Sequence, residues 1–84
     1  MAHMENPVFF TMKSRRYKTR SKMIYELGRW VENNYHPDYK DMQSFKSRAE
    51  QQMNDIWQKG KPLIVVAAMD MDVPGEEVYF DTLY

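Results

Sequence analysis

Leu63-Ile64-Val65-Val66-Ala67-Ala68-Met69 forms an uninterrupted apolar run, and the predicted fold depends on it. The run is bounded by Pro62 and Asp70, is too short for a helix of its own and is rich in β-branched residues. A run of this kind is typical of a strand that is buried on both faces. The sequence therefore predicts that residues 63–69 form the centre of a sheet.

Two further segments are predicted to pair with this central strand. Pro7 to Lys13 alternates in the two-residue period of a pleated strand, with Val8, Phe10 and Met12 on one face and Phe9, Thr11 and Lys13 on the other. Val73-Pro74-Gly75-Glu76 suits a type II turn, so Glu77 to Leu83 is predicted to close a C-terminal hairpin. The first strand could pair beside the second or beside the third. We favour the apolar run in the centre, with the other two strands at the edges.

The segment between the first two strands is predicted to form two amphipathic helices. The first begins near Thr19 or Ser21, either of which is an acceptable N-cap. Its apolar residues recur three and four positions apart and form one stripe that faces a core. They are Met23, Ile24, Leu27, Trp30, Val31 and Tyr35. Gly28 costs about 1 kcal/mol relative to Ala inside a helix, so another element is expected to approach it closely.

The second helix is predicted to begin at Pro37 or Asp41 and to end at Lys59. Gly60 can adopt the left-handed conformation that ends a helix, and Pro62 cannot continue one. Because the connection between the helices is short, they are expected to be antiparallel neighbours. The predicted fold is a single α+β domain of order β-α-α-β-β, with two antiparallel amphipathic helices on a three-stranded sheet.

Residue types that are absent or rare limit the possible chemistry. Met1 to His3, ahead of Met4, look like a cloning remnant, so one domain is expected over residues 4–84. The chain has no cysteine, which excludes disulfides, cysteine-based zinc sites and thiol nucleophiles and favours a cytoplasmic location. No apolar stretch approaches the roughly 20 residues that span a bilayer, so no membrane partner is expected.

Charge is balanced in total but unevenly distributed. The chain has 12 basic and 12 acidic residues. Six bases and no acid lie between Lys13 and Lys22, whereas five acids and no base lie between Pro62 and Tyr84. Such an asymmetry indicates candidate binding surfaces.

The basic segment, Lys13 to Lys22, is one candidate nucleic-acid site. Its bases are interleaved with Tyr17 and with hydroxyl groups, a composition that suits phosphate contacts combined with base stacking. The alternative is a solvated connection whose charge is balanced by the acidic C-terminal strand. The zero net charge favours this alternative, because it weakens long-range attraction of a polyanion.

Other chemistry is weakly supported by the sequence. Asp70, Asp72, Glu76 and Glu77 could hold a hard cation, but they lack the spacing of a calcium-binding loop. His36 precedes Pro37 in the helix–helix connection, where a capping or surface role is the more common one. No nucleophile elbow, phosphate loop or dinucleotide-binding pattern is present. We therefore expect no enzymatic activity, no cofactor and no metal.

The many aromatic residues favour a protein-binding role. Five tyrosines exceed what one small core can hold, and Tyr, Trp, Met and Arg are enriched in interfaces. The face of the sheet that carries Phe9, Tyr79 and Leu83 is expected to bind a protein partner, in the manner of an inhibitor or adaptor, or a second copy of the chain. Small aromatic-rich domains without cysteine are also common among virus-encoded accessory proteins. The predicted partner-binding residues are Arg15, Arg16, Tyr17, Lys18, Arg20, Tyr79, Asp81 and Leu83.

Overall fold

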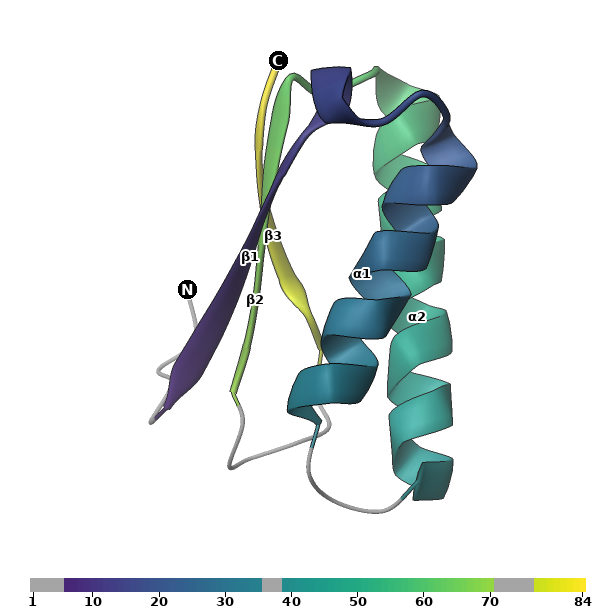
Figure 1. Cartoon of the computed structure of the whole chain (residues 1–84), viewed down its shortest axis with the longest axis vertical. Helices are drawn as coiled ribbons and strands as arrows, with labels where there is room; N and C mark the ends of the chain where they lie inside the picture. Colours follow the sequence, from purple (N-terminus) through teal and green to yellow (C-terminus); the bar gives the residue numbers. More distant parts are fainter. Residues whose placement is uncertain (1–5, 36–38, 71–76) are drawn as a thin grey trace.

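Two helices pack on one face of a three-stranded antiparallel sheet (Figure 1), in a computed structural model that describes residues 6–35, 39–70 and 77–84. The element order confirms the predicted α+β fold. The elements are β1 (Pro7–Lys13), a short 3-10 helix η1 (Ser14–Arg16), α1 (Arg20–Asn34), α2 (Tyr39–Lys59), β2 (Ile64–Asp70) and β3 (Tyr79–Leu83).

The strand order is β1-β2-β3, so the apolar run occupies the centre of the sheet as predicted. β1 and β3 both pair antiparallel with β2, and β2 with β3 forms the predicted hairpin. Its turn at residues 73–76, the helix connection at His36 and the remnant at residues 1–3 lie outside the described residues.

The core lies between the sheet and the helices. β2 contributes Val65, Ala67 and Met69, which are fully or almost fully buried. Buried residues of the two helical stripes meet them, namely Met23, Leu27 and Val31 of α1 and Phe45, Ala49 and Met53 of α2. Aromatic contacts tie the layers together, since the ring centroids of Phe10 on β1 and Trp30 on α1 are 5.8 Å apart. The predicted helical stripes are therefore confirmed.

The prediction that both faces of residues 63–69 are buried was wrong. Both helices cover the same face of the sheet, and among residues 6–35, 39–70 and 77–84 no further element covers the other (Figure 1). On that other face Ile64 and Val66 are only half-buried, and Leu63, just before β2, is exposed. A continuous apolar run thus serves here as a strand with one covered side and one open side.

Local chemistry explains where the helices begin and end. The Thr19 side chain accepts a hydrogen bond of 3.1 Å from the backbone N–H of Lys22 and caps α1. α2 ends at Lys59, as predicted, and the backbone N–H of Gly60 donates to the Ile56 carbonyl at 3.3 Å.

Gly28 is the point of close approach between the two helices. A Cβ atom placed there would lie 2.9 Å from Cε of Lys46 and 3.1 Å from Oε1 of Glu50, both on α2. The Lys46 ammonium also binds the carboxylate of Glu32 on α1. The predicted reason for a glycine inside this helix is therefore confirmed.

Candidate functional site

The face of the sheet turned away from the helices is the main candidate site, and we call it the open face. Strand alternation places four residues of β1, four of β2 and three of β3 on it. They are Pro7, Phe9, Thr11 and Lys13 of β1, Ile64, Val66, Ala68 and Asp70 of β2, and Tyr79, Asp81 and Leu83 of β3.

The strand register arranges nine of these residues in three rows that run across all three strands, and Pro7 pairs with Asp70 beyond the first row. Phe9 and Tyr79 both pair with Ala68 in the first row. Thr11 and Asp81 both pair with Val66 in the second. The third row, formed in the same way, is Lys13, Ile64 and Leu83.

The open face exposes large apolar side chains to solvent. Phe9 retains 60% of its accessible surface and Leu83 retains 58%. Single exposed apolar residues are ordinary. Here two of them share a face on which the central strand adds the apolar side chains of Ile64, Val66 and Ala68. Contiguous apolar surface of this kind is typical of an interaction site.

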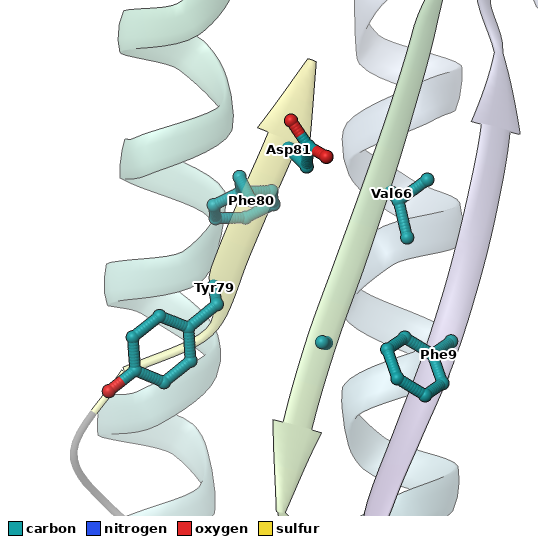
Figure 2. Close-up of a pocket in the computed structure, with 6 residues that line it drawn as sticks. Phe9, Val66, Tyr79, Phe80 and Asp81 are labelled. Atoms are coloured by element: carbon teal, nitrogen blue, oxygen red, sulfur yellow. The ribbon is translucent and has the colours of Figure 1, made fainter. Parts of the chain in front are cut away.

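A shallow pocket of about 370 Å³ is centred on the first row of the open face. Figure 2 views the sheet with the helices behind it and shows the rings of Phe9 on β1 and Tyr79 on β3 on either side of β2. Ala68 between them is only 4% exposed, although no helix covers it. The small side chain of Ala68 therefore leaves the sheet surface low between Phe9 and Tyr79, with the Phe9 ring toward β2 and the Tyr79 ring turned away from β2 at the outer side of β3. The lining is completed by Val66, Phe80 and Asp81.

The predicted basic residues lie at one end of the molecule. η1, the connection that follows it and the start of α1 carry four exposed bases near the C-terminus of the chain (Figure 1), namely Arg15, Arg16, Lys18 and Arg20. Lys22 is engaged in an ion pair of 3.3 Å with Glu26. A second hollow, of about 260 Å³, joins this segment to the sheet and is lined by Lys13, Ser14, Arg15, Leu63 and Ile64.

The environment of Tyr17 differs from the one expected for a residue that stacks on a nucleobase. Its side chain is half-buried against the hydrophobic core. Burial raises the pKa of Tyr17 above its ordinary value, the Glu26 carboxylate raises it further, and Arg16 opposes both. A ring held in this way presents less of its face to a nucleobase than a free one.

The structure thus brings together the predicted partner-binding residues of β3 and separates them from the predicted residues of the basic segment. Tyr79, Asp81 and Leu83 share the open face, whereas the four exposed bases lie beyond its end. The prediction of partner-binding residues omitted Phe9, Val66 and Ala68, which line the same pocket. Alternation in β1 pointed to Phe9, but no pattern inside an unbroken apolar run distinguishes Ala68 from Ala67.

The described part of the chain contains neither a cluster of metal-ligand side chains nor a helix that could span a membrane. Within residues 6–35, 39–70 and 77–84, no three His, Cys, Asp or Glu side chains are grouped as a metal site would require. In the same ranges no helix is long and apolar enough to cross a membrane. The predicted acidic loop at residues 70–77 and His36 fall largely or wholly outside the described residues.

Comparisons with known proteins yield no relative. No protein-family model, no curated protein and no solved structure matches the chain.

Proposed function

We propose that this chain is a non-catalytic interaction domain that binds a protein partner through the open face of its sheet. The single observation that carries the proposal is the apolar pocket lined by Phe9 and Tyr79, on the sheet face opposite to the one that α1 and α2 cover. In this proposal the domain acts on its protein partner as an inhibitor or as an adaptor.

The energy available at this face is sufficient for specific recognition. A Phe side chain buries roughly 150–250 Å² when fully enclosed. Since Phe9 leaves 60% of its surface exposed, covering it would contribute about 2–4 kcal/mol at 25 cal/mol per Å². Leu83 adds a similar exposed fraction. Aromatic anchors beside a pocket are the usual carriers of binding energy in protein interfaces.

The chemistry of the pocket favours binding over catalysis. Its lining contains one carboxylate, Asp81, and one phenol, Tyr79, among apolar side chains. General acid–base or nucleophilic catalysis needs a reactive group within hydrogen-bond reach of a base. No such pair is formed by the residues that line this pocket.

The test is affinity capture with matched variants, followed by titration of the purified partner. Phe9→Ser removes an aromatic from the open face, and Tyr25→Ser removes an equally exposed aromatic, 57% accessible, from α1. We expect Phe9→Ser to weaken the measured affinity at least tenfold and Tyr25→Ser to change it less than twofold. Partner binding that survives Phe9→Ser combined with Leu83→Ser would refute the proposal.

A second candidate function is nucleic-acid binding by the basic segment, supported by four exposed bases at one end of the molecule. If all six bases of Lys13 to Lys22 contacted phosphates, affinity would fall with salt at a log–log slope of about −4 to −5. Titration of single- and double-stranded DNA and RNA at two salt concentrations tests this. Tight, salt-dependent binding that is lost on Arg15→Ala with Arg16→Ala would favour this function over the first. The absence of binding at low salt would eliminate it.

A further inference from the structure

We propose that the outer edge of β3, together with the neighbouring side of α2, binds an extended basic segment of a partner protein as a fourth strand of the sheet. The inference rests on the proposed function, because it takes the partner to be a protein. It goes further by naming the part of the partner that is bound and its chemistry. Its support is a hollow at this edge, an unused hydrogen-bond acceptor in the hollow and the charges around it.

The hollow, which we call the β3 edge site, has a volume of about 330 Å³ and lies between the last turns of α2 and the start of β3. It is lined by Gln52, Asp55, Ile56 and Lys59 of α2 and by residues 77–80. Figure 2 shows how it arises, since the green helix α2 lies beside β3, past the edge of the sheet, whereas α1 lies behind β1 and β2. Three strands are therefore too narrow to cover α2.

The unpaired edge of β3 requires an extended occupant. Among the described residues β3 pairs only with β2, so alternate backbone N–H and C=O groups along its other edge meet no strand. A segment added to such an edge is held by main-chain hydrogen bonds, and its side chains alternate between the two faces of the sheet. One set of these side chains would cover Ile56 of α2, which is half-buried, and the other set would extend the open face.

Gln52 provides an acceptor that the domain itself leaves unused. Its Oε1 atom is buried and accepts no hydrogen bond within residues 6–35, 39–70 and 77–84. Buried polar atoms almost always have a partner, because leaving one unpaired costs free energy. Since Gln52 lines the β3 edge site, rotation of its side-chain amide would present this oxygen to a backbone N–H of the added strand.

The charges around the β3 edge site favour a basic segment. Three acids, Asp55, Glu77 and Asp81, lie in or beside the hollow, against one base, Lys59. Asp81 is the middle residue of β3, so a base directly opposite it on the added strand would form a favourable cross-strand pair. The ring of Tyr79 is turned outward from β3 (Figure 2) and offers its face to a cation on the same strand.

The same carboxylate disfavours a second copy of this chain at the edge. Two β3 strands that pair antiparallel about a two-fold axis overlap along their whole length only when they are centred on Asp81. Each Asp81 would then lie opposite the other, and like charges directly opposite destabilise a strand pair. We therefore infer that the occupant is a different chain with a base at that position.

The test is fluorescence anisotropy with a labelled eight-residue peptide of alternating Val and Lys, titrated with the intact chain. We expect this peptide to bind at least tenfold more tightly than its counterpart of alternating Val and Glu. Asp81→Lys should reverse the preference, whereas Asp41→Lys, an exposed change in the first turn of α2, is the matched control and should alter the affinity less than threefold. Equal affinities for the two peptides, or no binding of the lysine peptide up to about 1 mM, would overturn the inference.

Methylated backbones test strand addition itself. In an extended chain the N–H groups of alternate residues point to the same side, so N-methylation of all valines blocks one edge of the peptide and N-methylation of all lysines blocks the other. An added strand uses only one of its edges. The affinities of the two methylated peptides should therefore differ at least tenfold, and equal affinities would contradict the proposed geometry.

Gln52→Leu distinguishes a binding role from a structural one. The variant lacks the acceptor and should bind the lysine peptide about three- to tenfold more weakly. Its midpoint of urea unfolding should not fall, because the change removes a buried oxygen that has no partner in the described chain. Unchanged peptide affinity would place the peptide away from the hollow and overturn the inference.

The outcomes separate this inference from the proposed function. Phe9 lies on β1, on the far side of the sheet from the β3 edge site, so Phe9→Ser should change the peptide affinity less than threefold. If the lysine peptide fails to bind while Phe9→Ser still weakens capture of a protein partner, the edge inference is wrong and the open face remains the binding surface. If Asp81→Lys reverses the peptide preference while Phe9→Ser leaves partner capture intact, the edge inference holds and the proposed role of the Phe9 pocket is wrong.

Discussion

Phe9 and Tyr79 come from opposite ends of the chain and lie across the sheet from each other, each paired with Ala68. Both residues line a pocket together with Ala68, and the Phe9 ring lies toward β2 whereas the Tyr79 ring points outward from β3 (Figure 2). Neither edge strand alone contains this pocket. It arises because β2 lies between β1 and β3 and places the small side chain of Ala68 between Phe9 and Tyr79.

The N-cap of α1 is predicted to stabilise the domain through one side-chain hydrogen bond. Thr19→Ala removes the acceptor for the Lys22 N–H and should lower the free energy of unfolding by about 1 kcal/mol. Thr19→Ser keeps a hydroxyl oxygen at the same place and should recover most of that loss. Urea unfolding of the two variants measures the difference. An equal loss in both would show that the cap hydrogen bond is not the cause.

Gly28 and Lys46 are predicted to be energetically coupled. Gly28→Ala gains about 1 kcal/mol of helix propensity, but the new methyl group displaces the Lys46 side chain from its pairing with Glu32. Alone, the change should alter the unfolding free energy by less than about 0.5 kcal/mol. Combined with Lys46→Ala, it should stabilise by about 0.5–1 kcal/mol relative to Lys46→Ala. Strict additivity in a double-mutant cycle would contradict the close approach of the helices.

Tyr17 is predicted to contribute to alkaline unfolding. Its pKa is raised in the folded chain, first by burial and then by Glu26, so the folded state holds the phenolic proton more tightly than the unfolded state. Its stabilising contribution is complete below the ordinary pKa of 10.0 and is lost as the pH rises through the higher folded pKa. Tyr17→Phe should therefore make stability fall less steeply above about pH 10. Chemical unfolding at several pH values, with Tyr25→Phe to account for the loss of one phenol, provides the test.

Much of the fold could be predicted because its signals are local. The end of α2 follows from Lys59, Gly60 and Pro62, and each acts within one turn of the helix. The central place of β2 follows from its unbroken apolar run, which is typical of the central strand of a sheet. Alternation in β1 correctly predicted which side chains share a face, since Met12 is buried on one face and Phe9 is exposed on the other.

The candidate site could be predicted only in part, because it depends on contacts between distant segments. Leu63 was expected in the interior, yet it is exposed. The prediction failed because an apolar run does not indicate whether both faces of its strand are covered. The pairing of Glu32 with Lys46 requires the packing of two helices, which their sequences alone do not specify. Tyr17 was expected to be available for stacking, but the turn after η1 packs it on the core.

The central claim is that the sheet has one covered face and one open face, and the neighbours Ala67 and Ala68 test it most directly. Both are almost fully buried, but Ala67 faces the helices and Ala68 faces the pocket between Phe9 and Tyr79. Urea unfolding of Ala67→Leu should show a loss of about 1–3 kcal/mol from overpacking, whereas Ala68→Leu should fill the pocket and lose less than about 0.5 kcal/mol. Equal losses at the two positions, or a larger loss at Ala68, would contradict the existence of an open face.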